Sequence, residues 1–340
     1  MSQTVILQVA ELEVLIEAAL TGADVAPAHA RSVARALTAA EIDGQKGHGL
    51  WRVPSYAAQV RAGKVDGRAE PVLQRPRPGT LLVDVAHGFA FPAFDLAIPA
   101  LTEMARANGI AAAGFVRSHH FGVAGHHVEK LAAAGLLALA CGNTPKTMAA
   151  YGGRKPIFGT NPLAFAAPRR GQLPLVMDFA LTHAARAKIV AAANKGEPIP
   201  EGWAVDADGR PTTDARAALA GTLLPIGGAK GSALALMVEL LAVALTGAQF
   251  GFEASSFLDD KGPPPAVGQF LLCIDPAAFA GPDVFASRIE AVALEIGQDG
   301  ARLPGSRRAE LRQRAAREGI AVDGALLAEV RLLGAAHRLP

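Results

Sequence analysis

The stretch Ile110-Ala111-Ala112-Ala113-Gly114-Phe115-Val116-Arg117-Ser118-His119-His120-Phe121-Gly122 marks a change in the character of the chain. Its first seven residues form a short apolar run that follows one glycine, and the stretch ends on another. Apolar runs bounded by glycine, proline or asparagine are typical of strands. Similar runs follow at residues 136–142, 162–167, 175–179 and 270–274. The middle of the chain is therefore expected to form a sheet.

The segments around these strands show helical periodicity. Residues 12–62 are predicted to be helical, with a second helix at 33–42 that Gly44 ends. A proline-rich connector at 71–78, a strand at 81–85 and an amphipathic helix at 93–108 follow. Residues 229–246 are apolar nearly all round and end at Gly247, so this helix is expected to be buried. Two more helices are expected at 282–297 and 307–319. This order of elements predicts a mixed α/β protein.

Composition excludes several classes of protein. At 340 residues the chain is expected to form about two domains. A formal net charge of +2 is too small to predict nucleic-acid binding. We expect no membrane span because no uninterrupted apolar run reaches ~18 residues, and the acidic start of the chain is not typical of a signal peptide. Cys141 and Cys273 lie in apolar runs, which predicts buried thiols in a cytoplasmic protein.

The first candidate site is the segment Asp43-Gly44-Gln45-Lys46-Gly47-His48-Gly49-Leu50-Trp51-Arg52-Val53-Pro54. Glycines on both sides of His48 leave the backbone free to present its ring to a cleft. Arg52 follows four residues later and shares a face with His48 if the segment is helical. A proton donor beside a guanidinium that binds carboxylates suits the reduction of a small 2-oxo or 2-imino acid. The alternative is a loop histidine beside a surface arginine.

Four histidines lie within nine residues, at positions 119, 120, 126 and 127. Glu129 is the one nearby carboxylate and no cysteine is close, so we expect no metal site. The segment instead predicts a loop after a strand that places one imidazole at the reacting centre. His126 and His127 are expected to be structural, near the start of the helix that follows.

Glycine-containing loops at residues 152–162 and 225–231 could let backbone amides approach an anion, and the second leads into the apolar helix. Neither loop matches the Rossmann or P-loop pattern, and each is also compatible with a simple tight turn. The turn Leu303-Pro304-Gly305-Ser306-Arg307-Arg308 is either an anion clamp or an ordinary solvated turn.

Five segments together resemble a known family: Gly47-His48-Gly49 and residues 118–122, 158–165, 206–214 and 225–231. Their order is that of the malate/L-lactate dehydrogenase-like oxidoreductases, which are distinct from Rossmann-type lactate dehydrogenases. The resemblance covers the chain from about Glu11 to its C-terminus. Residues 43–67 and 230–247 are most similar to the Δ1-pyrroline-2-carboxylate/Δ1-piperideine-2-carboxylate reductases, imine reductases that make L-proline and L-pipecolate.

The resemblance implies a non-Rossmann dinucleotide-binding domain with a largely antiparallel sheet and a helical domain built from both chain ends. Residues 1–115, completed by 299–340, would form the helical substrate domain, and residues 116–298 the dinucleotide-binding domain. It also implies a homodimer with the active site between the domains.

The same resemblance implies roles for individual residues. His48 matches the proton donor, Arg52 the carboxylate binder and Thr160 a residue that lines the substrate pocket. His120 matches a catalytic base of ureidoglycolate-type relatives. The nicotinamide dinucleotide would be lined by Ser118, His119, His120, Phe121, Val176, Met177, Asp178, Lys230, Pro304, Gly305, Arg307 and Arg308.

Two positions depart from the imine-reductase pattern. Gly47 stands where the family usually has serine, and Lys188 stands where an ungapped alignment places the relay carboxylate. The first expectation is still an NAD(P)H-dependent imine reductase, followed by a 2-hydroxy-acid dehydrogenase of the malate, lactate or ureidoglycolate kind. A dinucleotide-binding relative without activity is the third. Two arginine pairs, Arg169-Arg170 and Arg307-Arg308, favour NADPH, with NADH as the alternative.

Overall fold

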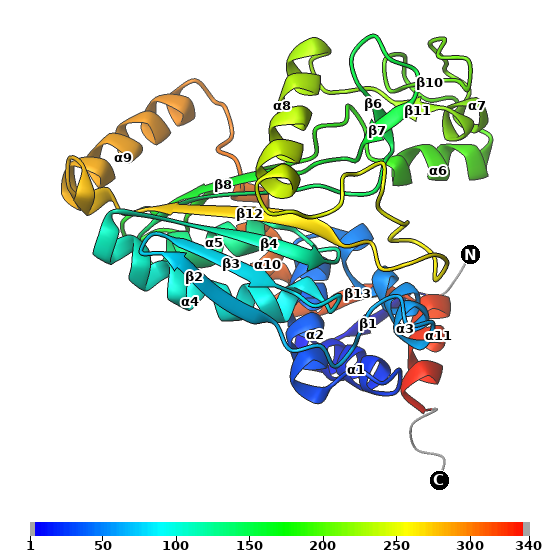
Figure 1. The fold of residues 1–340 in the computed structure, drawn as a ribbon, viewed down its shortest axis with the longest axis horizontal. Coiled ribbons are helices and arrows are strands. Elements are labelled where there is room, and N and C mark those ends of the chain that lie inside the picture. The colour runs from blue at the N-terminus through cyan, green and yellow to red at the C-terminus, as the bar shows by residue number, and fades with distance from the viewer. Residues whose placement is uncertain (1–3, 336–340) are drawn as a thin grey trace.

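A seven-stranded sheet forms the centre of the computed structural model, which describes residues 4–335 (Figure 1). Every neighbouring pair of strands in it is antiparallel except β3 and β4. The largely antiparallel, non-Rossmann sheet is confirmed. Its strands, in spatial order, are β2 (Val72–Arg77), β3 (Thr80–Asp84), β4 (Ile110–Ser118), β12 (Val267–Ile274), β5 (Leu137–Gly142), β8 (Leu163–Ala167) and β9 (Leu175–Phe179).

Helices α4 (Ala90–Asn108) and α5 (Ala124–Ala133) pack on one face of this sheet. Their core is built mainly on alanine and larger aliphatic side chains, and within it Phe94 is stacked on Phe115 at 4.2 Å between ring centroids. Side chains alternate along a strand, so Leu271 of β12 faces this core while Phe270 faces the opposite side.

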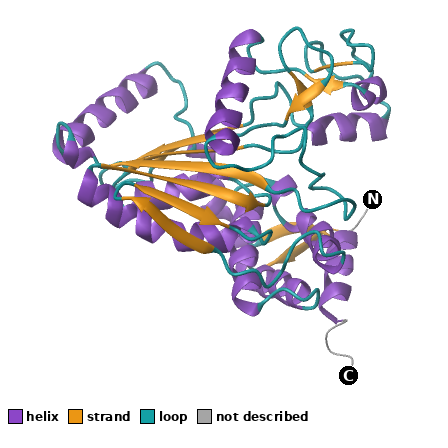
Figure 2. Cartoon of the chain, viewed as in Figure 1, coloured by secondary structure: helices purple, strands orange, loops and turns teal. Residues whose placement is uncertain are grey.

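The opposite face carries a smaller unit. It contains α6 (Arg186–Lys195), α7 (Ala215–Ala220), α8 (Ala229–Glu239) and a π-helical turn, Leu240–Ala244. A four-stranded sheet lies beside these helices, in the order β10 (Ala204–Val205), β11 (Thr222–Leu223), β6 (Met148–Ala149) and β7 (Pro156–Phe158) (Figure 2).

Both chain ends build the helical unit, as expected. The first described strand, β1 (Thr4–Leu7), pairs antiparallel with β13 (Ile320–Asp323) near the C-terminus. A shared core joins this pair to α1 (Val9–Thr21), α2 (Pro27–Ile42), α3 (Val53–Arg61), α10 (Ser306–Glu318) and α11 (Gly324–Ala335). The expected boundary at residue 115 falls inside β4, and β2 and β3 already belong to the central sheet. We therefore propose a domain boundary shortly before β2.

Two local expectations were wrong. Residues 72–77 form an edge strand and not a connector, since an edge strand tolerates Pro76 where the register shifts. The apolar helix from residue 229 is not buried all round: one side packs on the core, and Leu236, Leu240 and Leu245 are exposed. Its hydrogen bonding also changes from α to π at residue 240.

Helix α9 (Pro282–Gln298) stands away from the sheet (Figure 1). Val284, Val292 and Leu294 on this helix are exposed. Two ion pairs, Arg169 with Glu290 and Arg170 with Asp283, connect it to the turn between β8 and β9. Arg169 and Arg170 were one of the two arginine pairs expected to favour NADPH, and both already have carboxylate partners.

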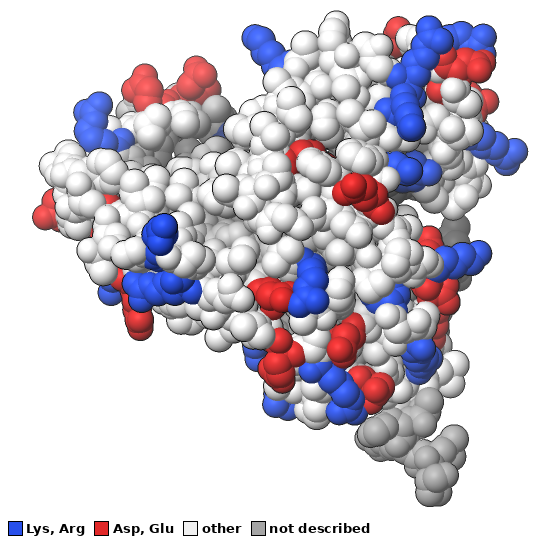
Figure 3. Space-filling view, in the orientation of Figure 1, with Lys and Arg blue, Asp and Glu red and all other residues white. Residues whose placement is uncertain are grey.

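Charged side chains of both signs are interspersed on the face shown in Figure 3, and a broad area over the sheet carries few of them. No helix among residues 4–335 is long and apolar enough to cross a membrane. Within that same range, no cluster of three or more His, Cys, Asp or Glu side chains could hold a metal ion. Cys141 and Cys273 are both buried and unpaired by a disulfide.

Candidate active site

The loop that carries His48 and Arg52 consists of two 3₁₀ turns, Lys46–His48 and Leu50–Arg52, directly before α3. Buried Glu41 at the end of α2 accepts a hydrogen bond from the Leu50 N–H at 2.8 Å. A Cβ atom at Gly49 would lie 2.4 Å from Oε1 of Glu41, so this close approach requires glycine. The glycine after His48 therefore serves the packing of the loop.

His48 and His120 meet although 72 residues separate them. Nδ1 of His48 lies 3.1 Å from Nε2 of His120, and the two rings are nearly parallel. On its other side, Nδ1 of His120 lies 2.6 Å from the Tyr56 hydroxyl. The loop after β4 thus joins the helical unit through a chain of three hydrogen-bonding side chains.

Burial determines the protonation states of His48, His120 and Tyr56. Burial, and then the positive charge of Arg52, lower the pKa of His48 to about 4. The same two causes lower the pKa of His120 well below its ordinary value, and burial raises that of Tyr56. At neutral pH both imidazoles are neutral and the phenol is protonated. If Tyr56 donates to His120 and His120 donates to His48, then Nε2–H of His48 remains to protonate a ligand.

Arg52 has the features of an anion-binding residue. Its Nε donates to the Gly47 carbonyl at 2.8 Å, which turns the guanidinium back over the loop. Its Nη1 is shielded from solvent and has no hydrogen-bond partner among the described residues. Burial lowers its pKa, which shows the cost of keeping this cation out of water. A carboxylate would satisfy the unpaired nitrogen.

Aromatic rings surround His119, the neighbour of His120. Tyr56, Phe89 and Phe257 all lie within 6 Å of its ring, centroid to centroid. Neither ring nitrogen has a partner in the described part of the chain, and burial lowers the pKa of His119 to about 3. It is a neutral imidazole that retains hydrogen-bonding capacity.

Thr160 lies in the loop between β7 and β8, where its hydroxyl is 3.2 Å from that of Thr144. The next residue, Asn161, is fully buried at a φ of +39° and donates to Oε1 of Glu239 at 3.0 Å. Glu239 is buried as well, and this burial raises its pKa. The carboxyl of Glu239 therefore anchors the loop that presents Thr160.

Five of the residues expected to line the cofactor come together. At the end of β9, the Asp178 carboxylate accepts from the Gly125 N–H at 2.9 Å and from Arg308 at 3.3 Å. Gly305, at a φ of +84°, brings the turn before α10 against Val176, whose carbonyl would lie 3.1 Å from a Cβ there. Pro304 belongs to the same turn.

This region fits a dinucleotide. Nη1 of Arg308 is buried without a partner in the described chain, and a Cβ on Gly125 would come within 2.9 Å of both Arg308 and Asp178. A guanidinium nitrogen without a partner, beside a helix N-terminus and a glycine-lined approach, is a suitable environment for a nucleotide. Asp178 and Arg308 are the residues that would hold it.

The other expected cofactor residues are more dispersed. Ser118 and Phe121 are buried, and the Phe121 ring belongs to the sheet core. Met177 is half-buried on β9, and Arg307 is exposed. Lys230 is exposed in the first turn of α8, directly after Gly227 and Gly228 at φ near +60°.

Arg312 connects α10 to Asp43 at the start of the active-site loop. It forms paired hydrogen bonds with the carboxylates of Asp43 and Glu129, at 2.6–2.8 Å. His126 is the fourth member of the cluster, 2.9 Å from Asp43. Although burial opposes it, hydrogen bonds from His126 and Arg312 hold the pKa of Asp43 at about 2.

Neither of the two relay positions carries a relay group. Gly47 has open space where a Cβ would lie, and no polar side chain. Lys188 on α6 lies 5.7 Å from the ring centroid of Trp203. Tyr56 was not singled out from the sequence, although its position four residues after Arg52 is a helical spacing that could have identified it.

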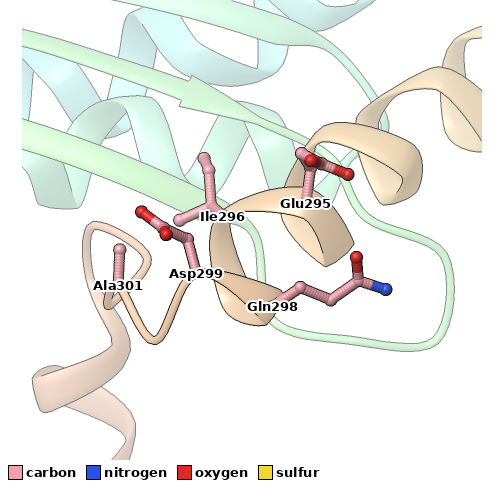
Figure 4. A pocket seen from close by; sticks show the side chains of 5 residues that line it. All are labelled: Glu295, Ile296, Gln298, Asp299 and Ala301. Atoms are coloured by element: carbon pink, nitrogen blue, oxygen red, sulfur yellow. The ribbon is translucent and has the colours of Figure 1, made fainter.

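A pocket at the end of α9 is lined by Glu295, Ile296, Gln298, Asp299 and Ala301 (Figure 4). None of the expected site residues belongs to it. Its carboxylates are also unsuited to an anionic substrate or cofactor.

Three comparisons bear on this arrangement. The family model of malate/L-lactate dehydrogenase matches residues 7–331. A (2R)-3-sulfolactate dehydrogenase (NADP(+)) of Chromohalobacter salexigens is 48% identical over 94% of this chain and 96% of its own. A Δ1-pyrroline-2-carboxylate/Δ1-piperideine-2-carboxylate reductase of Pseudomonas aeruginosa is 45% identical, over 90% of this chain and 92% of its own. The crystal structure of a Δ1-piperideine-2-carboxylate reductase from Pseudomonas syringae pv. tomato is similar at a TM-score of 0.92 and 38% identity, with 97% and 99% of the two chains covered.

Proposed function

Because the chain belongs to the malate/L-lactate dehydrogenase family of NAD(P)-dependent oxidoreductases, we propose that it transfers a hydride between a nicotinamide and carbon 2 of a small carboxylic acid. The first candidate reaction is the reduction of Δ1-piperideine-2-carboxylate or Δ1-pyrroline-2-carboxylate to L-pipecolate or L-proline. The observation that carries the proposal is the unpaired Nη1 of Arg52 in the loop that also presents His48.

In the proposed reaction, Arg52 binds the substrate carboxylate through its guanidinium. The reduced nicotinamide supplies the hydride when it is bound. His48 donates a proton from Nε2 to the substrate nitrogen, and His120 and Tyr56 replace it through their hydrogen bonds. Carboxylate binding neutralises the nearby positive charge of Arg52, which raises the proton affinity of His48 when the substrate arrives.

A 2-hydroxy acid is the second candidate substrate, and specific observations favour it. The serine and carboxylate of the imine reductases are absent here, at Gly47 and Lys188. The relative that is 48% identical is named for 3-sulfolactate, a 2-hydroxy acid. A neutral His48 backed by His120 also suits removal of the hydroxyl proton during oxidation.

A substrate panel distinguishes the two reactions. Cofactor oxidation is followed with Δ1-piperideine-2-carboxylate, Δ1-pyrroline-2-carboxylate, pyruvate, oxaloacetate and 3-sulfopyruvate, and cofactor binding is titrated separately. Turnover of the imines supports the first candidate, and turnover of 2-oxo acids alone replaces it with the second. Binding of the cofactor without any turnover would contradict both.

We also propose NADPH as the preferred cofactor, a cytoplasmic location and a homodimer. Arg307 and Arg308 support NADPH because guanidinium groups bind phosphate well. The dimer is supported by apolar side chains exposed on α8, on the π-helical turn that follows it and on α9, among them Leu236, Leu240 and Leu294.

A further inference from the structure

Lys64, just beyond α3, is a buried cation that has no part in the proposed reaction. Its side chain is 0% exposed. Nζ donates to the carbonyl oxygens of Asp259 at 3.0 Å and Lys261 at 2.6 Å, and lies 3.5 Å from the Asp259 carboxylate. Burying an ammonium group is costly unless its protons are hydrogen-bonded. All of these partners belong to one short segment.

Gln59 of α3 holds the same segment at a second point. It is fully buried, and its Nε2 donates to the carbonyl oxygens of Phe257 at 2.9 Å and Asp259 at 3.1 Å. Residues 257–261 follow α8 and its π-helical turn, so their attachment to α3 joins two distant parts of the chain (Figure 1). We call residues 257–261 the latched segment.

The latched segment places one aromatic ring against the imidazoles. Phe257 is 7% exposed, and its ring centroid lies 5.1 Å from that of His119 and 5.5 Å from that of His120. Behind it, Phe257 packs with Ala254 and Val267 in a small apolar cluster. The ring therefore shields one side of the histidine pair from water.

We propose that Lys64 is a positioning residue of the active site, which holds the latched segment on α3 so that Phe257 keeps His119 and His120 out of water. This inference rests on the proposed function in one respect, namely that His120 takes part in proton transfer. Lys64 makes its shorter hydrogen bonds to backbone oxygens of the latched segment, so it acts on His120 through the position of the Phe257 ring, whereas its charge also acts directly on His119.

The groups that face the pair determine the direction of the pH effect. His120 faces Arg52 and His48 from the active-site loop, Tyr56 from α3, and His119 beside it; His119 also faces the charge of Lys64. Burial is the largest cause of the low pKa of both histidines. Release of the segment admits water, so the pKa of each histidine is expected to rise.

The test compares Lys64→Met with Arg61→Met, which removes an exposed cation three residues away, at the end of α3. Hydrogen exchange of a peptide that spans residues 252–262 is expected to become at least ~10-fold faster in Lys64→Met and to stay unchanged in Arg61→Met. Histidine NMR titration of the free protein is expected to show a higher pKa for His120, and also for His119, where the loss of the Lys64 charge contributes as well. Variants at positions 119 and 120 assign the signals.

A double-mutant cycle with Phe257→Leu tests whether Lys64 acts through the ring. The kcat of Lys64→Met is expected to fall ~10-fold with little change in the KM for cofactor, and Phe257→Leu is expected to add no further loss. Unchanged exchange and titration in a folded Lys64→Met, or additive losses in the double variant, would overturn the proposal. If the wild type turns over no substrate of the panel, the proposed function fails, and the exchange and titration still decide the role of Lys64.

Discussion

At the scale of single residues, His48 depends on groups other than its immediate neighbour. Gly47 offers no hydroxyl, and His120 with Tyr56 supplies the hydrogen bonds that a serine could have provided. The backbone at Gly47 lies outside the left-handed region and has room for a side chain, so a serine can be introduced there without strain.

Replacing His48 by alanine is therefore expected to lower kcat by ~10²-fold or more, the usual loss when a general acid is removed. Steady-state kinetics on the best substrate of the panel measure it. Gly47→Ser is the matched control one residue away, and we expect it to leave kcat unchanged or modestly raised. Near-normal turnover by His48→Ala would assign the proton donor to another residue, with His120 the first to test.

Substrate affinity is expected to depend on the shape of the Arg52 side chain as well as its charge. Arg52→Lys retains the charge but loses the planar pair of donors, so the KM for the carboxylate substrate should rise ~10-fold or more, equivalent to ~1.4 kcal/mol. Arg61→Lys, on the exposed end of α3, is the control. An unchanged KM in Arg52→Ala would contradict the assignment of the carboxylate to Arg52.

How far the sequence predicts the site depends on sequence distance. His48 and Arg52 were identified because they lie four residues apart in one short segment, with glycines on both sides of His48. Lys64 and Phe257 were missed because they are 193 positions apart in the sequence, and only the fold brings the segment of Phe257 onto α3. Gly125 was missed because its role is to leave space between Arg308 and Asp178.

At the scale of elements, the turn before α10 is expected to determine cofactor preference. Arg169 and Arg170 already pair with carboxylates of α9, which leaves Arg307 as the exposed arginine of the other pair. Arg307→Ala is expected to raise the KM for NADPH ~10-fold and to leave that for NADH unchanged. Arg302→Ala, just before the same turn, serves as the control. Equal effects on both cofactors would refute a role for Arg307 in binding the 2′-phosphate.

Elements that a short stretch of sequence defines were predicted well. Elements whose burial depends on the other elements packed against them were predicted less well. The strand at residues 175–179 was predicted to the residue because the run is apolar and clearly bounded. The pattern at 229–246 predicts a helix correctly but not its exposed side, because a sequence gives hydrophobicity and not the number of elements that cover it. Likewise, the prolines around β2 predicted a connector, although β2 is an edge strand of the sheet, where proline is tolerated.

For the whole molecule, the exposed apolar side of α9 leads to a prediction about assembly. Leu294→Arg places a charge on that side, so the proposed dimer should dissociate into monomers of half the mass, as light scattering after gel filtration would show. The control is Glu295→Gln, because Glu295 is the next residue and its side chain is exposed and already polar. This variant should remain dimeric. A dimer of undiminished stability in Leu294→Arg would place the interface elsewhere.

Global stability is expected to fall in mild acid. His127 is stacked on Phe94, and its burial lowers its pKa to about 3. Below pH ~6.5 the unfolded chain binds a proton that the folded chain does not, so the free energy of unfolding decreases as the pH falls towards 3, by up to ~1.4 kcal/mol per pH unit for each such histidine. Urea unfolding at pH 7, 6 and 5 should show a smaller decrease in His127→Leu. The exposed His183→Gln should match the wild type, and an equal pH dependence in all three proteins would disprove the assignment.

The pairing of β1 with β13 determines which parts of the protein can fold only late in synthesis. The first described strand can complete its ladder only after residue 323 has been synthesised, and the hydrogen bonds between Asp43 and Arg312 can form only after residue 312 has been made. All strands of the central sheet, the last of which ends at Ile274, are therefore synthesised before Arg312, which secures the active-site loop. Nascent chains that stall before α10 would contain His48, His120 and Tyr56. They would lack Arg312, whose hydrogen bonds to Asp43 hold the active-site loop in place.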